Sequence, residues 1–214
     1  MKTYSHGKFQ LRITPRETLT RGEFYSLPPN TIALDGAVSG GPFFNAHLRL
    51  VNFDHHDGVV REATMSTAMQ VYFAIKGGLM DFLRPPIKIL LNDTDQDTAL
   101  AVWLLLNHRL FENTQSIPHI NRLLALSDRW DITGGAFPMN LDDSLVREHC
   151  WIFKPYSNLR TSGSLATATP DILHDNLCSV LQNLTQFLMG QAQETELDTR
   201  HEILYRGPRD SYWI

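Results

Sequence analysis

A recurring order of short apolar segment, aspartate and helix constrains the fold more than any other feature of this sequence. Residues 31–34, 48–53 and 87–91 are short apolar segments, and an aspartate follows each of them within two residues. Apolar residues at helical spacing occur over 63–77 and 97–108. This alternation predicts an α/β fold with a mostly parallel sheet flanked by helices. Because ligands bind at the carboxyl ends of parallel strands, we expect the aspartates to lie close together there.

The remaining sequence predicts further elements and a division of the chain. The same patterns predict an edge strand over 8–13 and helices over 116–128, 141–154 and 170–190. Ser, Thr and Gly are frequent in 155–169, which predicts a loop or linker, and 201–214 predicts a hairpin or strand. The strand–helix alternation weakens after Pro138. We therefore expect a core over 1–140 and a smaller C-terminal helical or α+β appendage, or cap, over 141–214.

Composition and charge narrow the functional classes. The 214 residues carry a formal net charge of −4 without a run of Lys or Arg, so binding to duplex nucleic acid is not expected. The two cysteines lack ligand-like spacing and predict reduced thiols in an intracellular protein. The first residues are polar and no apolar stretch of about 18 residues occurs, so neither export nor membrane spanning is predicted. We expect a cytoplasmic protein.

Three alternating aspartates, Asp93, Asp95 and Asp97, form an acidic loop directly after the apolar segment 87–91. At an effective dielectric constant of about 20, two unit charges 4 Å apart repel by about 4 kcal/mol, and bound cations remove that cost. Hard oxygen ligands suit Mg²⁺, Mn²⁺ or Ca²⁺. A solvated turn with Asp97 as helix N-cap would explain one aspartate but not three.

A calcium-binding EF-hand loop is the competing motif for these aspartates. Such a loop needs Gly at its sixth position and Glu at its twelfth. Counted from Asp93, those positions hold Thr98 and Leu104, so the sequence excludes an EF-hand.

The triplet Asp54-His55-His56 is the second group of ligand-type residues. Neutral imidazole is a common metal ligand, and a neighbouring carboxylate fixes its tautomer. Adjacent histidines on an extended segment point in opposite directions. One of them can therefore bind a metal ion while the other faces a substrate.

Residues 53–58 (FDHHDG) resemble the signature of the DHH phosphoesterase superfamily. That group includes RecJ-type exonucleases, oligoribonucleases that degrade nanoRNA, cyclic dinucleotide phosphodiesterases and family II inorganic pyrophosphatases. Its members carry a D-x-D-x-D or H-x-D-x-D loop after a strand, and residues 93–97 are similar to the first form. The resemblance covers about residues 30–135 and implies a DHH-like core.

Other positions extend the resemblance, although their order differs from that of the family. Asp35 matches an isolated aspartate that ends another strand, and Asp128 is the best match to a later one, with Asp131 as the alternative. Residues 66–68 are similar to the small-residue helix that follows the triplet. In the family the acidic loop comes before the isolated aspartate and the triplet. A circular permutation of the core would explain the order found here.

The family's usual second domain carries a glycine-rich, histidine-containing substrate motif, which this sequence lacks. The nearest substitute is the segment 160–164 (RTSGS), where Arg160 and Ser162 could bind a phosphate or carboxylate. An ordinary flexible loop is the more conservative interpretation.

The resemblance implies a hydrolase that uses two ions of Mn²⁺, or of Mg²⁺, to cleave a phosphodiester or phosphoanhydride. The implied metal ligands are Asp35, His55, Asp93, Asp95, Asp97 and Asp128. His56 and Asp54 are the implied catalytic residues: His56 would face the phosphate, and Asp54 would orient the histidines.

The implied substrate is a small phosphorylated compound or a short oligonucleotide. The C-terminal third would either cap the site or contact a neighbouring subunit, as in a homodimer. Two alternatives remain, a catalytically inactive DHH-like protein with a binding or regulatory role and a metal hydrolase that acts on a non-phosphate bond.

Overall fold

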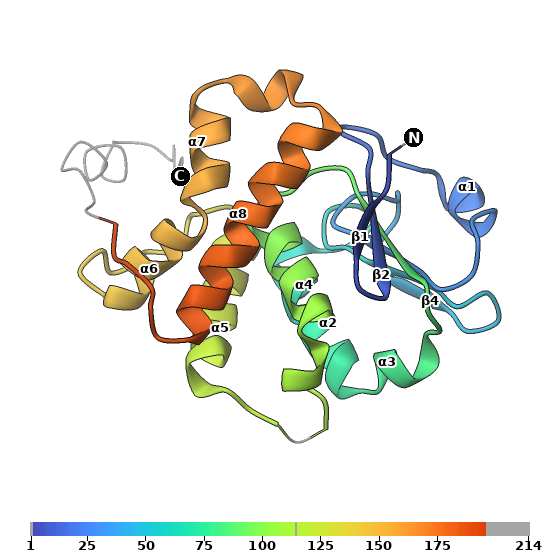
Figure 1. The fold of residues 1–214 in the computed structure, drawn as a ribbon, viewed down its shortest axis with the longest axis horizontal. Coiled ribbons are helices and arrows are strands. Elements are labelled where there is room, and N and C mark those ends of the chain that lie inside the picture. Colours follow the sequence, from blue (N-terminus) through green and yellow to red (C-terminus); the bar gives the residue numbers. More distant parts are fainter. Residues whose placement is uncertain (1, 114, 196–214) are drawn as a thin grey trace.

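A computed structural model describes residues 2–113 and 115–195, and its centre is a six-stranded sheet in the order β1-β2-β6-β3-β5-β4 (Figure 1). The strands are β1 (Tyr4–His6), β2 (Phe9–Ile13), β3 (Thr31–Leu34), β4 (Phe43–Asn45), β5 (Leu50–Phe53) and β6 (Ile87–Leu91). Strands β2, β6, β3 and β5 run parallel, and β1 and β4 pair antiparallel at the two edges. The expected α/β fold with a mostly parallel sheet is confirmed.

Alternation of side chains along the strands divides the core into two clusters. In β3, Ile32 and Leu34 belong to the larger cluster under the helices, whereas Ala33 belongs to a smaller one that includes Phe24. Successive strand side chains point to opposite faces, which accounts for this division. All four residues of β3 are buried, as expected of a central strand covered on both faces.

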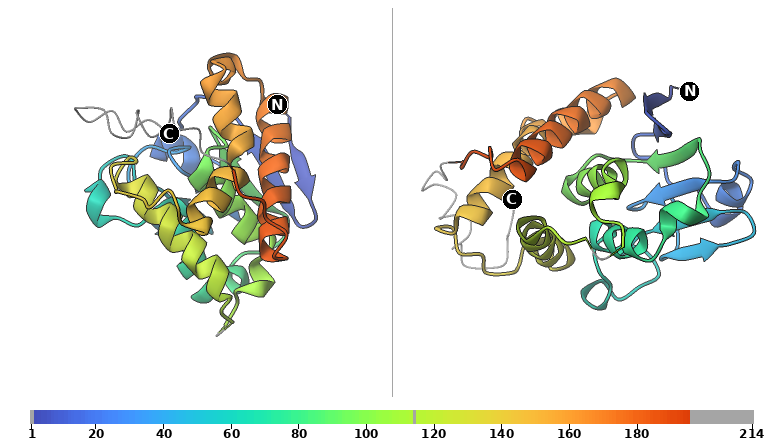
Figure 2. Two further views of the ribbon diagram at one scale, coloured as in Figure 1. Left: turned by 90° about the vertical axis from the view of Figure 1, so that its left-hand side faces the viewer. Right: turned by 60° about the horizontal axis from the view of Figure 1, so that its bottom comes forward.

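Most of the helices cover, in two layers, the face of the sheet that carries the larger cluster, whereas the helix with Phe24 contributes to the smaller cluster. The helices are α1 (Arg21–Tyr25), α2 (Thr67–Lys76), α3 (Leu79–Phe82), α4 (Gln96–Leu106), α5 (Pro118–Ile132), α6 (Ser144–Ile152), α7 (Lys154–Thr161) and α8 (Pro170–Leu188). Figure 2 shows α4 between the sheet and α8. The side chain of Ser66 accepts from Met69 N at the start of α2, and Gly77 ends that helix as expected.

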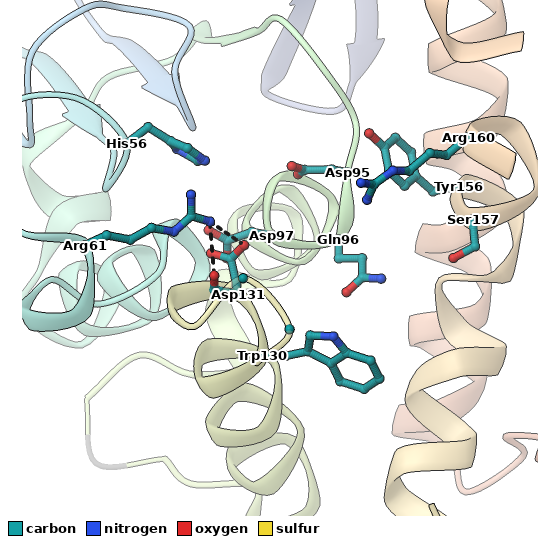
Figure 3. A pocket seen from close by; sticks show the side chains of 12 residues that line it. His56, Arg61, Asp95, Gln96, Asp97, Trp130, Asp131, Tyr156, Ser157 and Arg160 are labelled. Atoms are coloured by element: carbon teal, nitrogen blue, oxygen red, sulfur yellow. Dashed lines mark hydrogen bonds and ion pairs between the residues drawn. The ribbon is translucent and has the colours of Figure 1, made fainter. Parts of the chain in front are cut away.

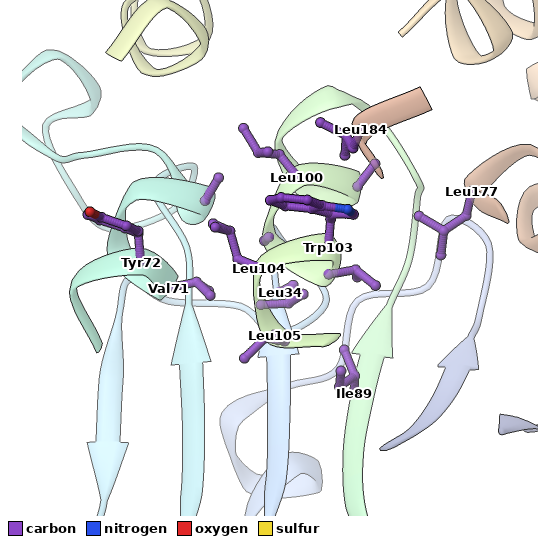
Figure 4. Close-up of a cluster of buried hydrophobic side chains, with 14 of the residues drawn as sticks. Leu34, Val71, Tyr72, Ile89, Leu100, Trp103, Leu104, Leu105, Leu177 and Leu184 are labelled. Atoms are coloured by element: carbon purple, nitrogen blue, oxygen red, sulfur yellow. The ribbon is translucent and has the colours of Figure 1, made fainter. Parts of the chain in front are cut away.

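The C-terminal helices pack on the same hydrophobic core as the first helices. Trp103 and Leu100 of α4 lie in one cluster with Leu177 and Leu184 of α8 (Figure 4). The Trp103 Nε1 donates a 3.2 Å hydrogen bond to Thr185 Oγ1. Position 140, the expected boundary, falls in the connection between α5 and α6. One continuous apolar cluster therefore spans both sides of that position.

Two sequence-based expectations about secondary structure are wrong. The segment 155–169 is not a loop, because it contains most of α7 and a short 3₁₀ helix, Ser164–Thr167. Tyr156 is buried and anchors α7, and the Thr161 hydroxyl donates back to the Ser157 carbonyl. Hydroxyl-rich sequence can form a helix in this way when one side is packed.

Strand β2 is also not an edge strand, because the hairpin with β1 covers its outer side. The segment 201–214 lies outside the described residues. Within the described part of the chain, no helix combines the length and the apolar character needed to cross a membrane.

His149 in α6 generates a testable pH dependence of stability. Burial lowers the pKa of His149 from 6.5 to about 3, and its ring stacks on Trp130 with the ring centroids 4.7 Å apart. Below pH 6.5 the unfolded chain binds a proton here and the folded chain does not. As the pH is lowered from 6.5 towards 3, the free energy of unfolding should therefore fall by about 1.4 kcal/mol per pH unit.

Urea denaturation at pH 7 and pH 5 measures this effect. The variant His149→Phe should lose about 2 kcal/mol less stability than the parent over that interval, because it lacks the titrating ring. An identical loss in the two proteins would contradict the assignment.

Candidate metal centre

Three adjacent strands bring the acidic and histidine segments to one edge of the sheet. Asp35 follows β3, the triplet 54–56 follows β5, and the acidic loop 92–97 follows β6. Because β3 lies between β5 and β6, Asp35 lies between the other two segments. Asp35 adopts a φ of 51°, a left-handed conformation that aspartate tolerates better than most residues.

His55 is at the centre of the site and is fully buried. Its Nε2 lies 2.7 Å from Asp131 Oδ2 and 3.6 Å from both Asp35 Oδ1 and Asp97 Oδ2. Within the described residues, neither ring nitrogen of His55 has a hydrogen bond, nor does Asp131 Oδ2, because the short contact lacks hydrogen-bond alignment. Three carboxylates thus surround an imidazole nitrogen that itself has no hydrogen bond, an arrangement typical of ligands around a cation.

The start of α2 holds two of these carboxylates in place. Asp97 accepts hydrogen bonds from the backbone amides of Thr67 at 2.6 Å and Ala68 at 2.8 Å. Asp35 accepts from the hydroxyls of Thr67 at 2.9 Å and Thr98 at 3.2 Å. The small residues after the triplet therefore act as donors to the acids, which the positive end of a helix dipole also favours.

Asp54 and His56 form a second, hydrogen-bonded part of the site. Asp54 Oδ1 accepts from His56 N at 3.0 Å and lies 3.2 Å from His56 Nδ1, so the buried Asp54 orients His56. His56 Nδ1 is also 3.2 Å from Asp35 Oδ1. The hydrogen bonds with Asp35 and Asp54 raise the pKa of His56 to about 10. Burial raises the pKa of Asp35, but the hydrogen bond and charge of His56 outweigh it, so the net shift is downward.

The aspartates of the acidic loop have different hydrogen-bond partners. Asp95, not Asp97, is the N-cap of α4, and its Oδ1 accepts from Thr98 N at 2.9 Å. Asp93 accepts from the Tyr156 hydroxyl at 2.8 Å. Burial, followed by the charges of neighbouring aspartates, raises the pKa of Asp95 and of Asp97 well above the ordinary value.

The two alternative later aspartates occupy different places on α5. Asp128 accepts a 2.8 Å hydrogen bond from the backbone amide of Ser66, the N-cap residue of α2. Asp131 instead contacts His55, and Arg61 donates to its carboxylate at 3.3 Å and to its carbonyl at 3.0 Å. The geometry thus brings Asp131, and not Asp128, into the group around His55.

A pocket of about 270 Å³ lies over these residues, with α7 as its second wall (Figure 3). The lining residues are His56, Arg61, Asp95, Gln96, Asp97, Trp130, Asp131, Gly134, Gly135, Tyr156, Ser157 and Arg160. Figure 3 shows Asp95 between His56 on one side and Arg160 on the other. Ser162 does not line this pocket, and its hydroxyl donates to the Leu159 carbonyl.

Arg61 and Tyr156 are among the polar pocket residues that sequence reasoning missed. Arg61 lies shortly after the triplet and before the predicted helix 63–77, and nothing else in the sequence marks it as a site residue. Tyr156 fell in the segment predicted to be a loop, so no pattern marked it as a partner for Asp93. Both are placed by packing between elements distant in sequence.

Two groups of aspartate and histidine side chains in this site, each with two buried members, could hold metal ions. Asp35, His55 and His56 form one group, and His55, Asp97 and Asp131 form the other, with the donor atoms in each group within 4.8 Å of one another. Carboxylate oxygen with imidazole nitrogen is a donor set suited to Mn²⁺ and related divalent ions. Searches against protein-family models, curated proteins and solved structures find no significant match for this chain.

A matched pair of substitutions on α5 tests which aspartate belongs to the centre. Asp131→Asn should weaken Mn²⁺ binding at least tenfold, about 1.4 kcal/mol, because it removes a charged oxygen from the group around His55. Asp128→Asn should leave the affinity nearly unchanged, since an amide oxygen can still accept from Ser66 N. Isothermal titration with Mn²⁺ measures both. The reverse ranking would place Asp128 in the centre.

Proposed function

We propose that this protein is a divalent-metal-dependent phosphoesterase, using Mn²⁺ or Mg²⁺, that hydrolyses a small phosphorylated compound or a short oligonucleotide. The observation that carries the proposal is the position of His55 Nε2, within 3.6 Å of Asp35, Asp97 and Asp131. These residues come from two strand ends and two helices, and they converge beside the pocket.

Charge supports a resident cation in this site. Burial and mutual repulsion raise the pKa values of Asp95 and Asp97, so the protein by itself disfavours their ionised forms. At an effective dielectric constant of about 20, each close pair of carboxylates costs about 4 kcal/mol. Divalent ions would offset this repulsion, and His55 Nε2, which has no hydrogen bond, would hold one of them.

The chain's own residues suit the hydrolysis of a phosphate ester. A pair of bound divalent ions would activate a water molecule and neutralise charge on the attacked phosphoryl group. His56 lines the pocket and is oriented by Asp54, so its ring can donate to a phosphate oxygen. Arg160 lines the same pocket, where a guanidinium can bind phosphate with two parallel hydrogen bonds.

The resemblance to the DHH phosphoesterases supports the same reaction class. Its motif residues meet at the ends of β3, β5 and β6, which are neighbours in the sheet. Because a site depends on spatial convergence and not on chain order, the permuted order is compatible with a DHH-like centre. The pocket of about 270 Å³ also favours a small substrate over a duplex.

A second candidate function is that of a DHH-like binding or regulatory protein without turnover. The observation in its favour is the hydrogen bond between the Tyr156 hydroxyl and Asp93, which engages one carboxylate oxygen of an expected metal ligand. The sequence also lacks the family's glycine-rich substrate motif. Such a protein would bind the metal ion and the phosphate compound but would not hydrolyse it.

Hydrolysis of bis(p-nitrophenyl) phosphate and of short oligonucleotides, with Mn²⁺, Mg²⁺ or a chelator, tests the proposed activity. His55→Gln should lower the metal-dependent kcat at least about 100-fold, or about 2.7 kcal/mol, because it removes the shared ligand. Chelation should abolish activity in the parent. Activity that survives chelation would overturn the metal mechanism, and metal binding without hydrolysis of these substrates would favour the second candidate.

Arg160 tests whether α7 contributes to substrate binding. Arg160→Ala should raise KM about tenfold with a smaller effect on kcat, because a phosphate contact is lost. Arg129→Ala is the matched control, since Arg129 packs over the Phe137 ring and does not line the pocket. Equal effects of the two substitutions on KM would contradict the role of Arg160.

A further inference from the structure

A second group of ligand-type side chains lies away from the pocket, between β1 and α8. His6 ends β1, and His174 and Cys178 are four residues apart in α8 and so share one face of the helix. One donor atom of each residue lies within 4.8 Å of the other two. His6 pairs with Phe9 at the start of β2. The group therefore lies toward the amino ends of the parallel strands, at the opposite edge from Asp35.

Two of the three distances between the donor atoms are those of a tetrahedral metal site. His6 Nε2 and His174 Nε2 are 3.2 Å apart, and Cys178 Sγ is 3.6 Å from His174 Nε2. Around a tetrahedral zinc ion, bond lengths of about 2.05 Å to nitrogen and 2.3 Å to sulfur separate two nitrogens by about 3.3 Å and a nitrogen from a sulfur by about 3.6 Å. The distances in the structure agree with these values to within about 0.2 Å.

The surroundings fix one of the rings and leave the group accessible. The Tyr4 ring stacks on His174 with the centroids 3.8 Å apart and the planes 8° apart. The Tyr4 hydroxyl donates to Asp171, so β1 is held against the first turn of α8. The His174 side chain is 17% exposed, which allows a solvent molecule to approach. Without an ion, a hydrogen bond between the two imidazoles and a weak one between Cys178 and His174 connect the same three side chains, and the ion would replace both.

We propose that His6, His174 and Cys178 form a zinc site, separate from the pocket, with the fourth position taken by solvent. Two imidazole nitrogens and a thiolate suit Zn²⁺, whereas Mg²⁺ and Mn²⁺ favour oxygen ligands. Binding replaces the S–H bond of Cys178 by a sulfur–zinc bond and releases that proton to solvent. The ion joins the edge strand β1 to α8, so its role is to hold the amino-terminal hairpin on the helical layer.

Titration of the full-length, chelator-treated protein with Co²⁺ as a zinc substitute tests this site. The parent should develop a near-ultraviolet thiolate-to-cobalt charge-transfer band, and Zn²⁺ should remove it by displacement. Cys178→Ser should lose the band, and Cys150→Ser, which changes the other cysteine, should retain it. His174→Gln provides a second variant that keeps both thiols. The Co²⁺ affinity read from this band should be at least tenfold lower in that variant than in the parent.

A metal ion bound in the pocket would not contribute to this band, because the ligand-type residues there offer only oxygen and nitrogen atoms. The band should therefore persist in Asp131→Asn, whether or not the protein proves to be a phosphoesterase. Zn²⁺ should raise the melting temperature of the parent and of Cys150→Ser by more than that of Cys178→Ser, in which only the pocket remains to bind the ion. A parent protein without the band, or a band that survives in Cys178→Ser, would overturn the proposal.

Discussion

The repulsion between aspartates buried at one edge of the sheet is the constraint on which the rest of the site depends. Donors from two helices oppose that repulsion. The amides at the start of α2 bind Asp97, and the hydroxyls of Thr67 and Thr98 bind Asp35. Asp95 caps α4. Both helices thus point their positive ends at the acids, which favours negative charge there before any cation binds.

The hydrophobic layers account for how the two walls of the pocket are held together. Trp103 and Leu100 of α4 are buried between the sheet and α8, and α7 packs against α8. The residues of α7 that face the pocket therefore have fixed positions relative to the strand ends. Segments that are far apart in the sequence contribute to one cavity because a single apolar core connects them.

The parts that the sequence predicts well are those determined by local pattern. The strand over 31–34 and its aspartate could be predicted because a β-branched residue and three apolar residues end in a turn, and Gly77 marks the end of a helix. Parallel strands then require Asp35 and the triplet to meet. This reasoning accounts for most of the candidate metal centre.

The parts that could not be predicted depend on contacts between elements. Asp128 and Asp131 lie three residues apart on one helix, and only the rotation of α5 against α2 determines which of them faces His55. Tyr156 reaches Asp93 from a segment whose composition suggested a loop. The strand β1 has only three residues and was not predicted, yet it pairs with β2, so β2 is an interior strand and not an edge strand.

The position of β3 has a consequence for biosynthesis. The chain makes β3 first among the three strands that form the site, yet β3 lies between the other two. A nascent chain that has emerged as far as the triplet still lacks the neighbouring strand β6 and the residue Asp131. The residues of the candidate centre can therefore come together only after α5 has emerged from the ribosome, and a cation that they held would bind late in synthesis.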